Sequence, residues 1–214
     1  MSKLPQGTTD LELFQLGDPY YWGKDFAQEL RDKIQGRVIF TDHDAGLLCQ
    51  MIMNARHGDH VEIGTFFGAS AILVAAAKKH FNAHGKIYCV DPLEARNDVM
   101  LDHTSEIVAT TKIVYENAGI FDVRDRIEIH PHASKPWPLK DRTFATAYID
   151  GDHWNGFPRH DWNALRKTIT YSVMFDDYCW GKTEVIETVI RAMSDPYWIP
   201  IHISGLSAIL RRRH

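Results

Sequence analysis

Ionisable side chains follow two apolar stretches of the chain, FATAYI (144–149) and YSVMF (171–175). Consecutive strands usually lie near one another, so the two groups are expected to converge above one sheet. Carboxylates brought together repel unless a cation lies among them or one is protonated. Oxygen ligands suit a hard divalent ion such as Mg²⁺, with positions left for water or substrate. The alternative is that each acid caps the helix that follows it. The residues concerned are Asp150, Asp152 and His153 after the first stretch and Asp176 and Asp177 after the second.

A second pattern with chemistry is VEIGTFFGAS, in which an apolar run leads into Gly64 and Gly68. Glycine lets the backbone approach a ligand closely, and a helix that begins just afterwards directs its N-terminus at that ligand. A plain strand-to-helix turn would also explain the glycines. Glu62 favours a ligand, because a carboxylate inside a strand end needs a partner and a ligand ammonium supplies one.

Asp91 ends the next apolar run, KIYCV. An acidic residue at this place typically accepts hydrogen bonds from both hydroxyls of a ribose, and a helix cap or a turn aspartate is the alternative. The dinucleotide fingerprint GxGxxG is absent, since three other residues separate Gly64 from Gly68. The pattern therefore disfavours a dinucleotide and leaves a mononucleoside open.

The elements that must position these residues alternate, from residue 60 onward, between short apolar runs and amphipathic stretches. This alternation is typical of an α/β fold with right-handed βαβ units and a mostly parallel sheet, whose ligands bind beyond the carboxyl ends of the strands. A further helix is expected within TDHDAGLLCQMIMNAR, with Asp42 or Asp44 as its N-cap, and another over roughly 24–35. The expected strands are about 60–64, 86–90, 126–130, 144–149, 171–175, 197–203 and 206–212, and the other helices are 69–81, about 103–118 ending at Gly119, about 157–168 and 181–193.

Composition limits the partners. A chain of 214 residues fits one domain, here 1–214, with residues 1–40 as a helical cap. With 24 basic and 28 acidic residues, the net charge of −4 offers no footprint for nucleic acid or an anionic membrane. Three widely spaced cysteines indicate buried thiols in a reducing compartment. The first residues lack a secretory signal and the apolar runs are too short to span a membrane, so we expect a soluble, cytoplasmic protein with a small-molecule partner.

Taken together, EIGTFFGAS, VDP, IDGDH and FDDY resemble the class I S-adenosylmethionine-dependent methyltransferases, in particular the metal-dependent O-methyltransferases that include catechol and caffeoyl-CoA O-methyltransferases. More similar still is the bacterial branch with IDGDH and FDDY strand ends, which includes sugar and macrolide-sugar O-methyltransferases. The resemblance covers about residues 40 to 213. It implies a single Rossmann-like domain with a mostly parallel seven-stranded sheet flanked by helices, its last strand antiparallel, and S-adenosyl-L-methionine and Mg²⁺ as cofactors.

The resemblance also implies a role for each matched residue. His153 occupies the place where relatives carry a Lys or His base, which would accept the proton of an acceptor hydroxyl near neutral pH. A metal on the substrate oxygens would acidify that proton and fix the geometry of attack. For Asp152, which the resemblance does not assign, three roles stay open: to orient His153, to support other residues around the site, or to cap the helix after Gly156. The implied cofactor contacts are Glu62, Gly64, Thr65, Gly68, Ser70, Asp91, Ala133, Ser134 and Asp150, and the implied metal ligands are Asp150, Asp176 and Asp177.

The expected function is therefore methyl transfer to a hydroxyl of a small-molecule acceptor such as a sugar, a phenol or a natural product. A tailoring hydroxylase of the same branch, a metal-independent methyltransferase and a protein that binds the cofactor without turnover stay open. Two features depart from the relatives: the Gly-Gly turn before FDDY is replaced by LRKTIT, and extended acceptor-binding insertions are absent. The acceptor pocket would be open or completed by a second subunit, which leaves a homo-oligomer open.

Overall fold

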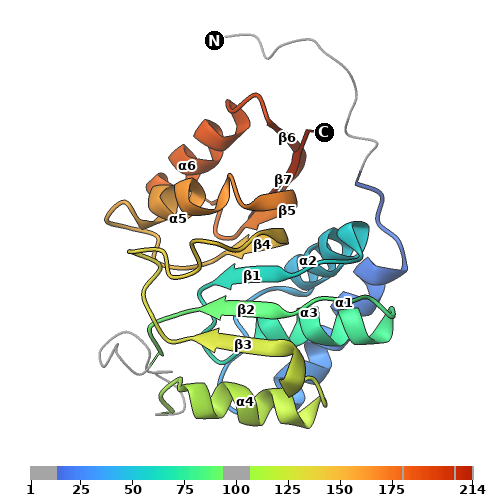
Figure 1. The fold of residues 1–214 in the computed structure, drawn as a ribbon. Helices are drawn as coiled ribbons and strands as arrows, with labels where there is room; N and C mark the ends of the chain where they lie inside the picture. Colours follow the sequence, from blue (N-terminus) through green and yellow to red (C-terminus); the bar gives the residue numbers. More distant parts are fainter. Residues whose placement is uncertain (1–13, 94–106, 180, 205, 214) are drawn as a thin grey trace.

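The structure is a computed structural model that describes residues 14–93, 107–179, 181–204 and 206–213. Its centre is a seven-stranded sheet in the order β3-β2-β1-β4-β5-β7-β6, with helices on both faces (Figure 1). The strands are β1 (His60–Ile63), β2 (Ile87–Val90), β3 (Ile127–His130), β4 (Phe144–Ile149), β5 (Ile169–Phe175), β6 (Trp198–Ser204) and β7 (Ser207–Arg212). The helices are α1 (Asp18–Lys33), α2 (Asp42–Ala55), α3 (Ala69–His80), α4 (Thr111–Ile120), the short 3₁₀ turn η3 (Arg124–Arg126), α5 (Phe157–Leu165) and α6 (Thr183–Met193).

The sheet confirms the expected α/β class. Strands β1 to β5 pair in parallel, and β7 pairs antiparallel with both β5 and β6. The strand order reverses between β1 and β4, and ligands of open α/β sheets bind at such a switch point. Ile63 pairs with Ile149 across these two strands, so the residues that follow each of them, Gly64 and Asp150, leave the sheet side by side.

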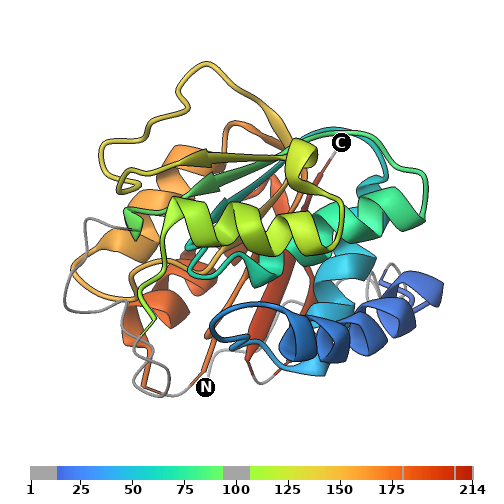
Figure 2. The same ribbon diagram turned by 90° about the horizontal axis from the view of Figure 1, so that it is seen from below.

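Two apolar cores cover the two faces, because side chains alternate along each strand. Helices α1 to α4 share one core with residues such as Cys89 and Tyr148. Helices α5 and α6 share the other core with residues such as Val90 and Ile149. Figure 2 shows α5 and α6 on the side of the sheet opposite to α1 and α2. None of the helices in the described ranges is long and apolar enough to span a membrane.

The N-terminal helices cross at close range. Gly23 of α1 and Gly46 of α2 make this possible, since a Cβ at Gly23 would lie 2.8 Å from the carbonyl oxygen of Ala45. The expected N-cap of α2, Asp42 or Asp44, is wrong: Thr41 is the N-cap, and its hydroxyl accepts the Asp44 N–H at 3.1 Å. The Asp44 carboxylate in turn accepts the N–H of Thr41, which completes a capping box. Helix α1 also begins earlier than expected, at Asp18.

Two other helix boundaries differ from expectation. Helix α5 ends at Leu165 rather than near 168, because the N–H of Thr168 bonds to the Leu165 carbonyl at 2.8 Å and β5 begins at Ile169. The turn before β5 therefore closes without the glycines of the relatives. Helix α4 begins at Thr111 and is capped by the Thr110 hydroxyl. Residues 107–110, which were expected to be part of this helix, are therefore not helical. The rest of that expected start, residues 103–106, lies outside the described residues.

Candidate active site

Gly64 connects β1 to the turn before α3. The Asp150 backbone lies so close to Gly64 that no other residue fits at this position. Its φ is +90°, and an added Cβ would lie 1.9 Å from the carbonyl oxygen of Asp150. A side chain of any size would push the ends of β1 and β4 apart. Gly68, with φ +85°, then serves as the N-cap of α3. The glycine at 64 thus places the turn directly against Asp150.

Glu62 lies beneath this turn and is completely buried. Neither of its carboxylate oxygens has a hydrogen-bond partner, nor does the hydroxyl of Thr65. Burial raises the pKa of Glu62 to about 7, although the nearby Ser70, Thr65 and Cys89 side chains partly oppose the rise without reaching full hydrogen-bond geometry. A buried carboxylate without a partner is costly, and a cationic group of a ligand would satisfy it.

Asp91 organises the same turn through the backbone. Its Oδ2 accepts the N–H groups of Thr65 and Phe66 at 2.6 and 3.0 Å, and its Oδ1 accepts the N–H of Leu93 at 2.9 Å. This is the turn aspartate that the sequence leaves open as the alternative to a ribose contact. Oδ1 accepts only one of these bonds and can accept a second, so a ribose hydroxyl and the turn can share the residue.

A small cavity of about 20 Å³ adjoins residues 64–68, which we call the glycine turn, and is also lined by Arg37, Phe40 and Asp150. That volume holds about one water molecule. The Phe66 and Phe67 rings pack 4.2 Å apart, and Phe66 adopts a φ of +49°. This cavity by itself is smaller than a nucleoside.

Asp150, His153 and Asp177 meet where β4 and β5 end. His153 Nε2 lies 3.5 Å from Asp150 Oδ1 and 3.4 Å from Asp177 Oδ2, and the three ligand atoms lie within 4.8 Å of one another. The Nε2 atom is buried and has no hydrogen-bond partner. Separations of this size fit donors around one divalent cation. We call these three residues the acidic centre.

The charges of the acidic centre are poorly compensated. Burial raises the pKa of Asp150 well above its ordinary value, and the Asp177 and Glu62 carboxylates raise it further. Burial also lowers the pKa of His153, and Lys182 lowers it again. Both shifts oppose charge on the groups concerned, and a cation placed among them would relieve the carboxylates.

Lys182, which the sequence analysis missed, completes this site. Its Nζ lies 3.0 Å from His153 Nδ1 and 3.6 Å from Asp177 Oδ2. Lys182 is the N-cap of α6, in the loop that follows the second acidic stretch. A basic residue so soon after FDDY is the one signal in the sequence that could have indicated it.

Asp176, which the sequence predicts to be a metal ligand, lies close enough to the acidic centre for the charges of Asp150 and Asp177 to act on it. Asp177 has a φ of +51°, so the chain turns sharply between the two aspartates. Burial, followed by the charge of Asp150, raises the pKa of Asp176 to about 8, and the Tyr148 side chain partly opposes the rise. Asp176 is not among the three described residues whose ligand atoms converge.

One alternative from the sequence, that Asp152 caps α5, is wrong. Its Oδ1 accepts the N–H of Trp154 at 3.0 Å, within its own loop. Gly156 is the N-cap of α5, and Glu184 of α6 accepts the N–H of Gly156 at 2.7 Å. The acid that supports this helix start therefore comes from another helix.

The remaining expected cofactor contacts lie at the end of β3. Ser134 is buried and Ala133 is exposed. The Ser134 carbonyl accepts a hydrogen bond from His160 Nε2 at 3.0 Å. Asp161, also completely buried, lies next to the Ser134 side chain, and burial raises its pKa to about 7. This loop therefore rests on α5.

A model of one family, described as methyltransferase domain, matches residues 61–178, which is more than half of the 214-residue chain. The chain belongs to the methyltransferase domain family. The matched part runs from β1 to just beyond Asp177, so it includes the glycine turn and the whole acidic centre but not Lys182. A comparison with curated proteins gives no significant match.

Several solved structures resemble this chain over nearly its full length. The O-methyltransferase from Bacillus cereus in complex with SAH has a TM-score of 0.61 at 13% identity, covering 95% of this chain and 100% of that one. The O-methyltransferase TomG from Streptomyces achromogenes, in complex with SAM, has a TM-score of 0.56 at 15% identity, covering 94% and 92%. The SAH-bound Podospora anserina methyltransferase PaMTH1 has a TM-score of 0.53 at 14% identity, covering 92% and 89%. At these identities the likeness establishes the fold.

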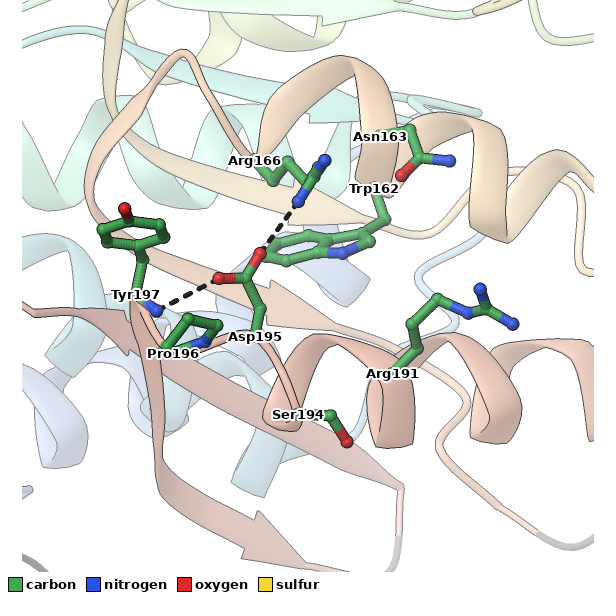
Figure 3. A pocket seen from close by; sticks show the side chains of 8 residues that line it. All are labelled: Trp162, Asn163, Arg166, Arg191, Ser194, Asp195, Pro196 and Tyr197. Carbon is green, nitrogen blue, oxygen red and sulfur yellow. Dashed lines mark hydrogen bonds and ion pairs between the residues drawn. The ribbon is translucent and has the colours of Figure 1, made fainter.

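A larger cavity of this methyltransferase domain protein, of about 500 Å³, lies away from these residues (Figure 3). It is lined mainly by residues that follow the C-terminal ends of α5 and α6, whereas the acidic centre lies near their N-terminal ends. Arg166 and Asp195 form an ion pair of 2.9 Å across it. The larger cavity is thus separate from the expected chemistry.

Proposed function

We propose that the protein is an S-adenosylmethionine-dependent O-methyltransferase that acts on a hydroxyl of a small-molecule acceptor with the help of a divalent cation. The observation that carries this proposal is the backbone contact between Gly64 and Asp150. Because of this contact, the glycine turn and the acidic centre lie next to each other at the switch point of the sheet. A methyl donor held by the first would lie beside an acceptor held by the second.

The residues around the glycine turn suit the methyl donor. The unpartnered Glu62 carboxylate would take the cationic amino acid part, and Asp91 the ribose. Ser134, with Ala133 beside it, would contact the adenine. The similar structures from Bacillus cereus and Streptomyces achromogenes are complexes with SAH and SAM, which supports the same choice of cofactor.

The acidic centre suits the acceptor. A bound Mg²⁺ or similar ion would supply Lewis acidity to the acceptor oxygen. Asp150 and Asp177 would hold that ion, with Asp176 behind them as the third carboxylate. His153 Nε2 would accept the hydroxyl proton as the oxygen forms its bond to the methyl carbon and the sulfur keeps the electron pair of the broken bond. His153→Ala should then lower kcat by about 10²- to 10⁴-fold.

Calorimetry with S-adenosylhomocysteine tests the cofactor half of the proposal. The wild-type chain should bind it, and Glu62→Gln should weaken binding by about tenfold, because a charged acceptor for the amino group is lost. Glu187→Gln is the matched control, since Glu187 is exposed on α6. The absence of binding by the wild-type chain would refute the proposal outright.

A further inference from the structure

Lys182 reaches into the acidic centre from a fixed backbone position. Its Nζ lies 3.0 Å from His153 Nδ1, 3.6 Å from Asp177 Oδ2 and 5.6 Å from the centre of the Trp154 ring. The Lys182 carbonyl accepts the N–H of Ile186 in the first turn of α6. Since the side chain is 30% exposed, it can swing toward solvent while the backbone stays in place.

The contact with Lys182 decides which ring nitrogen of His153 carries the proton. A lysine ammonium has three donors and no acceptor, so Nδ1 must accept in this contact. A neutral ring then carries its proton on Nε2, which faces Asp150 at 3.5 Å and Asp177 at 3.4 Å. His153 can therefore donate toward the two carboxylates in this arrangement, but it offers them no lone pair.

Any role of His153 toward a cation or an acceptor reverses this arrangement. Both a metal ligand and a general base need the lone pair of Nε2, which moves the ring proton of neutral His153 to Nδ1. Nδ1–H and the Lys182 ammonium would then be two donors facing each other. A divalent cation beside Asp177 would also repel the Lys182 charge, which lies 3.6 Å from the same carboxylate.

We infer that Lys182 and a divalent cation are alternative occupants of the acidic centre, and that Lys182 lowers the metal affinity because it must swing away before the cation binds. This inference rests on the metal site of the proposed function, but it requires neither the acceptor nor methyl transfer. It concerns a residue outside the part of the chain that the methyltransferase family model matches.

Mn²⁺ binding to the full chain, followed by the electron paramagnetic resonance signal of free Mn²⁺, tests the inference without cofactor or acceptor. Lys182→Met should raise the affinity about tenfold, because a unit charge next to the cation is removed. Lys182→Arg keeps a cation at this position and should stay close to wild type. Lys79→Met is the matched control, since Lys79 also pairs with an aspartate, Asp122, and its loss changes the net charge equally.

Melting temperatures provide a second readout. Without metal, Lys182→Met should melt below wild type, because two carboxylates lose their cation, and Mn²⁺ should raise its melting temperature more than that of wild type. A Lys182→Met affinity equal to or below that of wild type overturns the inference. Uptake of Mn²⁺ by neither chain overturns it too, and removes the metal from the proposed function. Methyl transfer is assayed separately, so a chain that gains Mn²⁺ affinity yet transfers no methyl group supports the inference and refutes the proposed function.

Discussion

Asp91 follows β2 and Asp150 follows β4, the two strands on either side of β1, yet their surroundings differ. Asp91 accepts three backbone N–H groups within 3.0 Å, which satisfy its charge inside the fold. Asp150 lies beside Asp177 and near Glu62, and its pKa is raised well above the ordinary value, chiefly by burial. The glycine turn is thus held together by its own backbone, whereas the acidic centre depends on side chains whose charges are not balanced.

The difference indicates how the two regions contribute to function. A carboxylate satisfied by the backbone stabilises the fold and fixes a loop. A buried carboxylate that lacks compensation weakens the fold, and such groups cluster at functional sites. We therefore expect substitutions in the glycine turn to affect stability first, and substitutions in the acidic centre to affect binding first.

Gly64→Ala should break the contact between the two regions and have the largest effect on stability. The added Cβ would lie 1.9 Å from the Asp150 carbonyl oxygen at a φ of +90°, so the free energy of unfolding should fall by about 4 kcal/mol or more. Gly156→Ala is the control, because Gly156 has a φ of +75° but no atom within 4 Å of the added Cβ. Its cost should be about 1–2 kcal/mol, from backbone strain alone. Urea denaturation measures both, and equal costs would contradict the steric explanation.

Asp91→Ala and Asp150→Asn sharpen the comparison directly. Asp91→Ala leaves the N–H groups of Thr65, Phe66 and Leu93 without their acceptor, and should cost about 3 kcal/mol. Asp150→Asn removes a buried charge next to Asp177, and should change stability by less than about 1 kcal/mol, on the stabilising side. Urea denaturation of both variants, with metal removed by a chelator, gives the values. A larger loss for Asp150→Asn would reverse our reading of the two regions.

The sequence predicts the glycine turn better than the acidic centre, for a physical reason. The mostly parallel sheet and the turn after β1 follow from local apolar runs and glycines, whereas the order of the strands does not. The start of α2 differs from expectation, because Thr41 and Asp44 exchange hydrogen bonds in a capping box that makes Thr41, rather than Asp42 or Asp44, the N-cap. Capping by Glu184 across two helices is likewise invisible to a local pattern.

Which residues form the acidic centre depends on side-chain orientations that the sequence does not specify. Asp176 and Asp177 are equivalent in sequence, but Asp177, with a φ of +51°, is the one whose carboxylate lies near His153. Lys182 joins the centre only because the start of α6 is folded back onto the loop after β4. Backbone patterns therefore predict where a site lies, and the tertiary structure decides which side chains form it.

The pH dependence of stability should show a smaller effect than Gly64→Ala or Asp91→Ala, and it should separate Glu62 from the satisfied Asp91. The pKa of Glu62 is raised from 4.5 to about 7 by burial, so between these values the folded chain holds a proton that the unfolded chain has released. Stability contributed by this proton is present at pH 4.5 and is lost as the pH rises through 7. Asp161, whose pKa is also about 7, adds to the same trend.

Glu62→Gln should therefore make the decline between pH 5 and pH 7.5 shallower, by about 2 kcal/mol over this range. Urea denaturation at several pH values measures the slope, and Glu187→Gln on the exposed face of α6 should leave it unchanged. S-Adenosylhomocysteine should have a similar effect to Glu62→Gln, since its amino group would pair with the ionised carboxylate and stabilise the folded state most at high pH. An identical slope in wild type and Glu62→Gln would mean that Glu62 is satisfied in the fold, as Asp91 is, and that the distinction between the two carboxylates is wrong.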